Sequence, residues 1–238
     1  SRNLRYARRD PQGRWTHTAI DGCADTDDCP SEMGENYGEY TSIGLVAGAP
    51  RIAFYDRLRG DLKLALQDAT GAWQVSTLDG RDPVTGVDTG DVGRFASLAV
   101  DPKRRLAVAY YDATAGALRY LVAAKGSPEP VVVDDGVLWD SDAQAMRTHL
   151  VGQHVKLRFD PGGRAVMVYL DASRRVMRVA AAGVGGHMDI EDLDLPAAGH
   201  VGFDFGPDGT LKGACGVWLI QDLPRTELRF FAWPQVKP

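Results

Sequence analysis

Short apolar runs separated by polar turns recur along this chain, and their spacing predicts strands rather than helices. The stretch RLAVAYYDATAGALRY (105–120) reads as two strands joined by a polar turn, and imperfect copies occur at 51–64, 164–179 and 211–230. The runs are short, rich in Val, Ala and aromatic residues, and lack the periodicity of an amphipathic helix. The sequence therefore predicts an all-β chain built from a repeat.

Each copy of the repeat contains four predicted strands. The first opens on a glycine followed by a polar residue, and a tight turn of Pro, Gly and Asp leads into the second, which mostly ends in Asp. The third begins with Leu or Met followed by Lys or Arg, and a fourth completes the unit. The opening glycines are Gly38, Gly93, Gly152 and Gly199. Four short strands in a unit of roughly 50–60 residues predict a β-propeller blade. A β-sandwich would not repeat one four-strand unit in tandem.

The repeats lie at approximately 1–21, 37–80, 92–135, 151–195 and 198–238, within a single predicted domain, 1–238. The third-strand motif occurs five times, whereas the pair of first and second strands occurs four times. We interpret this as about five four-stranded blades, with one blade split between the termini. The alternative is four blades, in which the N-terminal strands close the last blade. In the five-blade interpretation, the missing strands come from an upstream segment or from another chain.

Composition narrows the class of protein. The chain has 238 residues, a formal net charge of −5 and a pI near 5.5. This charge argues against nucleic-acid binding and against attachment to an anionic membrane. No apolar run approaches the roughly 18 residues of a membrane span, so we expect no membrane insertion. The sequence starts at Ser1 without Met, and we expect a mature or trimmed product.

Two of the three cysteines lie six positions apart in an acidic stretch, DGCADTDDCPSE, that has no regular pattern. We expect Cys23 and Cys29 to form a disulfide, and with it a secreted, periplasmic or cell-surface location. The alternative is a metal pair, but one pair without a second is a poor zinc motif. Cys215 is expected to be a small buried core residue.

The copies SLAVDPKRRLAVAYYDATAGALRY and SIGLVAGAPRIAFYDRLRGDLKL resemble repeats of secreted bacterial β-propellers, a group that includes sialidase-like Asp-box propellers and propeller lectins. The turns DPQGRW (10–15) and DATGAW (68–73) resemble Asp-boxes, in which Trp packs beneath the turn. They depart from S-x-D-x-G-x-T-W by an extra residue and a missing Ser. The resemblance implies a carbohydrate-binding, lectin-like protein. A sialidase would need clustered arginines and a Tyr nucleophile, and the sequence does not assign these.

Candidate binding residues lie on one face of the predicted propeller. The long connectors 22–37, 80–92, 134–150 and 194–198 share this face, and long loops on a rigid scaffold usually carry function. The residues after the opening glycines differ between copies at this face, as an asymmetric ligand would require. They are Glu39, Arg94, Gln153 and His200, followed by Tyr40, Phe95, His154 and Val201. The alternative is that a wet channel mouth tolerates any polar residue.

Trp139 is a further candidate. An exposed Trp beside carboxylates suits sugar stacking or a protein partner. The alternative is that it folds over the blade edge and covers core.

Three aspartates end the second strands of their repeats: Asp56, Asp112 and Asp171. We expect them to cap the following turn through side-chain hydrogen bonds to backbone. The alternative assigns them, with Glu39, to acid and base roles, as in five-bladed glycosidases that resemble this layout; such enzymes need two carboxyls at a defined separation.

Metal ligands are the remaining candidates. His149, His154 and His200 could converge on a transition metal, and the acidic runs 25–28 and 140–142 offer oxygen ligands for calcium. None completes a known ligand spacing. We therefore assign no metal and no cofactor, with calcium as the candidate to test.

The sequence favours a secreted bacterial recognition module that binds a glycan or a protein. Whether the chain is also an enzyme stays open, and the competing hypothesis is a glycoside hydrolase or lyase acting on polysaccharide. A third hypothesis is a structural domain for adhesion or assembly.

Overall fold

The computed structural model describes residues 4–21, 37–82, 84–123, 129–196, 199–221 and 223–233. The predicted Cys23–Cys29 disulfide and the acidic run 25–28 lie outside the described residues. Strands make up nearly all the regular structure, with one short 3-10 turn (Val184–Gly186). Within the described ranges, no helix has the length and apolar character to span a membrane.

The described strands follow the predicted order of short segments and tight turns. They are β1 (Leu4–Arg9), β2 (Trp15–Asp21), β3 (Tyr37–Val46), β4 (Ala49–Asp56), β5 (Asp61–Gln67), β6 (Trp73–Asp79), β7 (Val92–Val100), β8 (Leu106–Asp112), β9 (Ala117–Ala123), β10 (Val131–Asp134), β11 (Val137–Asp140), β12 (Ala145–Thr148), β13 (Val151–Phe159), β14 (Ala165–Asp171), β15 (Val176–Ala182), β16 (Met188–Pro196), β17 (Gly199–Phe205), β18 (Leu211–Gln221) and β19 (Leu223–Trp233).

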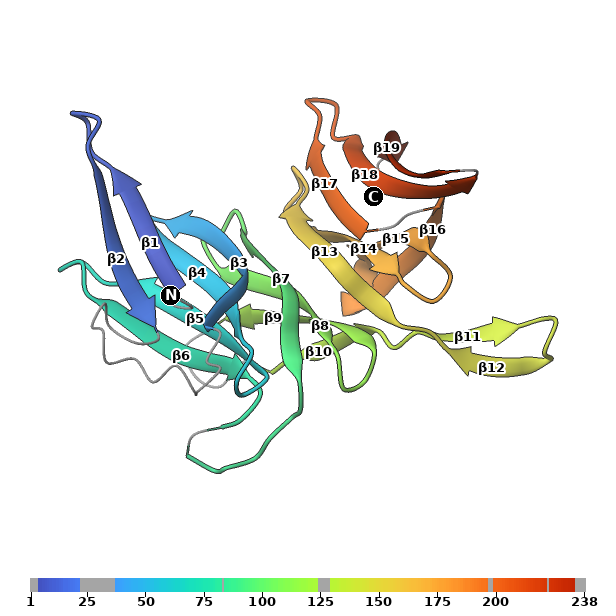
Figure 1. The fold of residues 1–238 in the computed structure, drawn as a ribbon, viewed down its shortest axis with the longest axis horizontal. Helices are drawn as coiled ribbons and strands as arrows, with labels where there is room; N and C mark the ends of the chain where they lie inside the picture. The colour runs from blue at the N-terminus through green and yellow to red at the C-terminus, as the bar shows by residue number, and fades with distance from the viewer. Residues whose placement is uncertain are drawn as a thin grey trace.

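These strands form the blades of a β-propeller, which confirms the predicted fold class (Figure 1). Three antiparallel sheets have four strands each: β3–β6, β7–β10 and β13–β16. The sheet β17–β19 has three described strands and the sheet β1–β2 has two. The first strand of each repeat is innermost, and β3, β7, β13 and β17 contact one another in that order.

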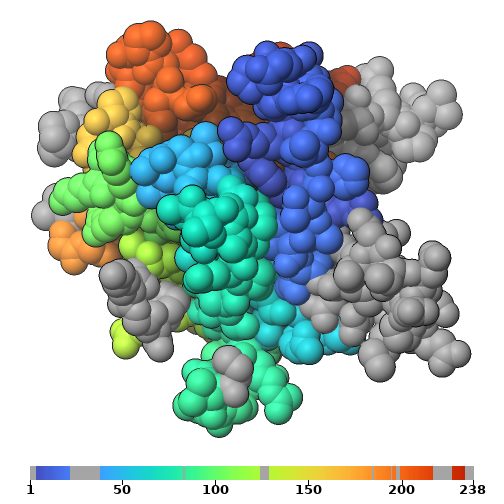
Figure 2. Space-filling view, turned by 90° about the vertical axis from the view of Figure 1, so that its left-hand side faces the viewer, coloured from blue at the N-terminus to red at the C-terminus, as the bar shows by residue number. Residues whose placement is uncertain are grey.

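The N-terminal hairpin belongs to a blade of its own. Strands β1 and β2 pair only with each other in the described sheets, and β1 contacts β3 while β2 contacts β6. Figure 2 shows this hairpin lying against the β3–β6 sheet. The two strands therefore occupy the third and fourth positions of a blade that precedes β3–β6, as the five-blade interpretation requires, and they do not complete the β17–β19 sheet.

The hairpin β11–β12 projects from the blades between β10 and β13 (Figure 1). The sequence predicted only a long loop there. Its strands have four residues each and are mostly exposed, so they carry little of the apolar pattern that marks the blade strands.

The core lies between neighbouring blades. All seven residues of β8 and of β14 are buried, because a middle strand is covered by another sheet on each face. This explains why those strands read as continuous apolar runs. Cys215, fully buried in the cluster between β13–β16 and β17–β19, is a core residue as the sequence predicts.

The opening glycines are required by contact with the preceding blade. A Cβ added to Gly93 would lie 2.8 Å from the Leu62 Cα, and one added to Gly152 would lie 2.8 Å from the Leu118 Cα. Leu62 and Leu118, at the same position of the third strand, thus pack against the next inner strand where only glycine fits. Gly38 makes the equivalent contact with Leu4, which again places β1 in a third-strand position.

The alignment of Gly199 with the other glycines is wrong by one residue. Gly199 pairs with Gly216, which occupies the position of Tyr111 in its sheet, and Tyr111 pairs with Arg94. Gly199 is therefore the counterpart of Arg94. A Cβ added to Gly199 would meet the His154 ring at 2.7 Å, so this glycine is needed for a different contact from the others.

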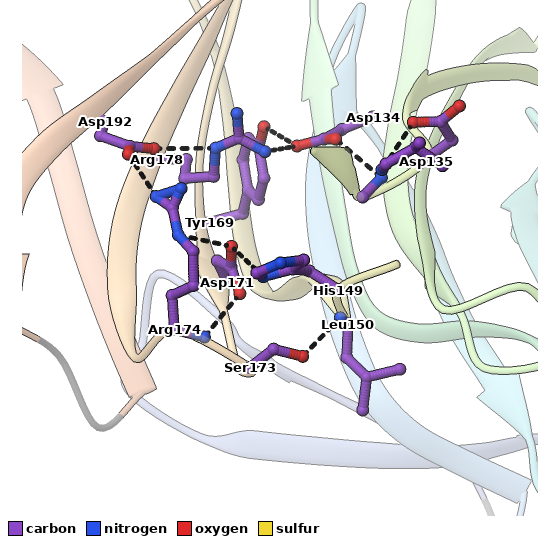
Figure 3. A network of polar contacts seen from close by, with 12 residues as sticks. Asp134, Asp135, His149, Leu150, Tyr169, Asp171, Ser173, Arg174, Arg178 and Asp192 are labelled. Carbon is purple, nitrogen blue, oxygen red and sulfur yellow. Dashed lines mark hydrogen bonds and ion pairs between the residues drawn. The ribbon is translucent and has the colours of Figure 1, made fainter. Parts of the chain in front are cut away.

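Buried ion pairs tie successive blades together (Figure 3). Asp134, at the end of β10, accepts a hydrogen bond from the Tyr169 hydroxyl at 2.6 Å and from Arg178 Nη1 at 2.5 Å. Tyr169 and Arg178 belong to the following blade. The two preceding junctions also pair an aspartate with a basic side chain, although the first of them has Phe54 in place of the tyrosine. The corresponding groups are Asp79 with Tyr110 and Arg119, and Asp21 with Lys63.

The Asp-containing turns resemble one another throughout the chain. The Arg14 amide donates to Asp10 Oδ1 at 2.8 Å, and the Arg105 amide donates to Asp101 Oδ1 at 2.7 Å. Since Asp101 lies in a turn between first and second strands, this turn is not restricted to the Asp-box-like positions. The expected packing of Trp beneath the turn is wrong for Trp15, which is 68% exposed among the described residues. Trp73 packs against the Tyr6 ring at 5.2 Å.

Candidate functional site

A pocket of about 390 Å³ lies where the beginnings of the four inner strands, β3, β7, β13 and β17, converge. All four strands contribute to its wall, so the pocket sits on the axis around which the blades are arranged. Its described lining consists of Tyr40, Thr41, Phe95, Ala96, His154, Val155, Lys156, His200 and Val201.

Four rings from successive blades form a continuous series along this wall. The Tyr40 and Phe95 ring centroids are 4.6 Å apart, those of Phe95 and His154 4.4 Å, and those of His154 and His200 4.7 Å. All four residues have left-handed backbone, with φ between 50° and 57°. The same bulge at the start of each inner strand therefore displays one ring per blade.

This register changes the predicted site. His200 was aligned with Glu39, Arg94 and Gln153, but it is the fourth member of the Tyr40, Phe95 and His154 series. The reason is the shifted position of Gly199 described above. Glu39, Arg94 and Gln153 are absent from the described lining of the pocket. The structure thus brings together Tyr40, Phe95, His154 and His200, four of the eight residues proposed to bind ligand.

The pocket holds an imidazole that stays neutral. Burial lowers the pKa of His154 to about 4, and electrostatic repulsion between its protonated ring and the neighbouring His200 and Lys156 acts in the same direction. Burial also lowers the pKa of Lys156, with the nearby Arg158 charge contributing. Near neutral pH, His154 therefore offers one hydrogen-bond donor and one acceptor from an uncharged ring.

Beside the pocket, Asp91 fixes two neighbours of the ring series. The Tyr55 hydroxyl donates to Asp91 Oδ1 at 2.8 Å, and Arg94 forms an ion pair with Asp91 Oδ2 at 2.5 Å. The Arg94 guanidinium also lies 5.6 Å from the Tyr55 ring centroid. Burial, together with Asp91, raises the pKa of Tyr55 to about 12. The sequence analysis does not single out Asp91, whose signals are its place in the long connector 80–92 and two residues before an opening glycine.

The carboxyl groups proposed as acid and base form ion pairs and hydrogen bonds with neighbouring residues. Glu39 forms an ion pair with Arg57 at 3.3 Å. Asp112 and its equivalents are fully buried and accept the expected backbone hydrogen bonds in the turn, such as Ala115 N to Asp112 Oδ1 at 2.8 Å. Each also faces a basic group. The pairs are Asp56 with Lys63, Asp112 with Arg119, and Asp171 with His149 and Arg174.

The remaining candidates lie apart from the pocket. Trp139 is on β11 and is 59% exposed, so it does not cover core. His149 Nδ1 lies 3.5 Å from Asp171 Oδ2 (Figure 3), whereas His154 and His200 contact each other in the pocket. Among the described residues, no three His, Cys, Asp or Glu side chains are grouped so that they could hold a metal ion.

No family model and no curated protein matches the sequence. Solved structures match its fold. One is a GH43 β-1,3-galactosidase in complex with galactodeoxynojirimycin, with a TM-score of 0.53, 8% identity, and coverage of 96% of this chain and 79% of that one. The fold is that of the GH43 propellers. At this identity, the likeness concerns the fold alone.

A second match is the exo-β-1,3-galactanase of Phanerochaete chrysosporium with β-1,3-galactotriose, with a TM-score of 0.52, 8% identity, and coverage of 97% of this chain and 50% of that one. A third is a bifunctional GH43-CE protein of Bacteroides eggerthii, with a TM-score of 0.50, 14% identity, and coverage of 89% and 28%. The chain spans about half the length of the galactanase.

Proposed function

We propose that this chain recognises a carbohydrate in the axial pocket. The observation that carries the proposal is the continuous series of four rings, Tyr40, Phe95, His154 and His200, along one pocket wall. The apolar face of a pyranose packs on an aromatic ring, while neutral imidazole and phenol groups exchange hydrogen bonds with its hydroxyls. The pocket volume falls within the range of small-molecule sites, which is roughly 300–1,000 Å³.

The backbone of these residues supports a binding role. Left-handed conformation is unfavourable for residues other than glycine and costs about 1–3 kcal/mol at each position. Four such residues converge on one pocket. Such strain clusters at sites where a side chain must be held in a fixed direction.

The fold neighbours support a carbohydrate ligand. The structures of those proteins contain galactose, β-1,3-galactotriose or galactodeoxynojirimycin. The proposal takes from them the class of ligand. The binding chemistry comes from the pocket of this chain.

Calorimetric titration with a panel of neutral and acidic oligosaccharides tests the proposal. Phe95→Ala should weaken binding of the best ligand at least tenfold, because it removes the ring between Tyr40 and His154. Phe230→Ala is the matched control, since Phe230 is 78% exposed on β19 and lies outside the pocket lining. If no oligosaccharide binds at millimolar concentration, or if Phe95→Ala binds like the parent, the proposal is wrong.

Glycoside hydrolysis is the second candidate function, and the GH43 fold of the neighbours favours it. A glycosidase needs two carboxyls, about 5–5.5 Å apart for retention or 6.5–9.5 Å apart for inversion. The candidate carboxyls are Glu39, which precedes the lining residue Tyr40, and Asp91, which binds Arg94 next to the lining residue Phe95. Both are paired with arginines, so catalysis would require a substrate to displace at least one of them.

Release of reducing ends from the oligosaccharide that binds best tests this second function. Glu39→Gln and Asp91→Asn should each lower the rate at least 100-fold while leaving the affinity within a few-fold. An absence of turnover in a protein that binds the ligand identifies a recognition module.

We also propose that the chain works outside the cytoplasm, and this rests on the spacing of Cys23 and Cys29 alone. Mass spectrometry of the non-reduced protein should find these cysteines linked. Two free thiols would remove the argument.

A further inference from the structure

Lys156 breaks the pattern of the inner strands at the pocket wall. In the two preceding blades the same register position holds a serine. Ser42 Oγ accepts a hydrogen bond from the Leu98 backbone amide, and Ser97 Oγ accepts one from the Leu157 backbone amide, each at 2.9 Å. These serines join one inner strand to the next. In the β13–β16 sheet, Lys156 occupies this position and lines the pocket in place of the serine.

Lys156 gives the pocket a positive charge without a matching negative one. The described lining contains no carboxylate, and His154 is neutral near pH 7. Arg94, whose neighbour Phe95 lines the pocket, is paired with Asp91, whereas Arg158 adds a second positive charge near Lys156. Within the described part of the chain, the ion pairs include none to Lys156.

An ammonium group in this position favours an anionic ligand. Lys156 is half-buried, and burial together with the Arg158 charge disfavours its protonated form. A bound carboxylate would restore favourable interactions for that charge, and it would do so in a partly desolvated site where ion pairs are stronger than in water. A neutral sugar would leave the ammonium group without a charged partner.

We propose that the axial pocket selects glycans that carry a carboxylate, that is, uronic-acid residues. Lys156 Nζ pairs with the carboxylate, and the neighbouring rings of Phe95 and His154 contact the sugar ring. This inference rests on the proposed carbohydrate binding and specifies its ligand class.

The test compares two oligosaccharides of the same length and linkage, oligogalacturonate and the corresponding galactose oligomer, by calorimetry at pH 7. The parent protein should bind the acidic oligomer at least tenfold more tightly, and Lys156→Met should abolish this preference. Lys156→Arg should retain most of it. Lys103→Met is the matched control, because Lys103 is an exposed lysine in the turn between β7 and β8.

The outcomes separate the two proposals. Equal binding of both oligomers by the parent, or an unchanged preference in Lys156→Met, overturns the acidic-ligand inference while carbohydrate binding stands. Weaker binding of both oligomers by Phe95→Ala, with the preference retained, supports separate roles for ring and cation. If neither oligomer binds and no other glycan binds, both proposals fail.

Discussion

The packing of each blade on the next makes a quantitative prediction about two leucines at the same position of the repeat. Leu118 on β9 is fully buried against Gly152 of the following blade. Leu228 on β19 occupies the equivalent position in its sheet, but it is 64% exposed. Leu118→Ala should lower the free energy of unfolding by about 2–5 kcal/mol, the usual range for a buried Leu→Ala change. Leu228→Ala should change it by less than about 0.5 kcal/mol.

Urea denaturation followed by circular dichroism measures both changes, and thermal melting gives a second reading. For a protein of this size, 1 kcal/mol corresponds to a shift of roughly 2–4 °C, so Leu118→Ala should melt at least about 4 °C below the parent. Similar losses of stability in both variants would show that Leu228 is buried in solution, and the exposed position of this side chain on β19 would then be wrong. A negligible loss for Leu118→Ala would refute the packing argument itself.

The glycine on the other side of this contact provides an independent check. Gly152→Ala places a Cβ 2.8 Å from the Leu118 Cα at a φ of 105°. Gly86→Ala is the matched control, because Gly86 also has positive φ (74°) but nothing lies within 4 Å of its added Cβ. The extra loss of stability in Gly152→Ala measures the steric contact between blades. Equal losses would mean that backbone strain alone requires the glycine.

Three further predictions concern charged and titratable groups. The folded-state pKa of His154 is about 4, below the 6.5 of the free side chain, so the unfolded protein binds more protons than the folded one between these pH values. The free energy of unfolding should therefore fall as the pH drops from 6.5 to 4. His154→Phe should flatten this pH dependence of the urea midpoint. Asp134→Ala should cost up to about 3–5 kcal/mol, because it removes one of the two carboxylate partners of the buried Arg178 and the acceptor of the Tyr169 hydroxyl. Asp135→Ala, at the exposed neighbouring position, should cost far less, and similar losses would contradict the bridge. Asp91→Asn should lower the pKa of Tyr55 from about 12 but leave it above 10, since burial is the larger cause; ultraviolet titration of the tyrosines reads this out, and an unchanged value would show that Asp91 does not act on Tyr55.

Much of the fold could be read from the sequence because its determinants are local. Short apolar strands and turn residues recur along the chain, and a glycine opposite a leucine recurs at Gly38, Gly93 and Gly152, so the four-strand unit is visible in the sequence. The position of Gly199 was misjudged because a glycine serves a different purpose there: it makes room for the His154 ring instead of a leucine. An alignment of the repeats cannot distinguish a glycine that makes room for a leucine from one that makes room for a histidine ring.

The site was less accessible to sequence reasoning because its contacts are long-range. Asp91 gains its role from Tyr55, which lies 36 residues away, and no local pattern announces that pairing. The aspartates of the second strands were conspicuous because they recur, and the structure shows them bonding to their own turns. At this pocket the candidate ligand contacts are the residues that vary between copies, Tyr40, Phe95, His154 and His200.

The four ring positions share one backbone geometry, and each belongs to a different blade. An exchange at one of them alters one sector of the pocket wall and the ring contacts to the neighbouring blades, and at His154 it also changes the contact with Gly199. Specificity can therefore be re-engineered one blade at a time. A set of variants in which Tyr40, Phe95, His154 and His200 are permuted would present the same rings in a rotated order. A ligand that lacks rotational symmetry would have to turn about the axis in order to follow them.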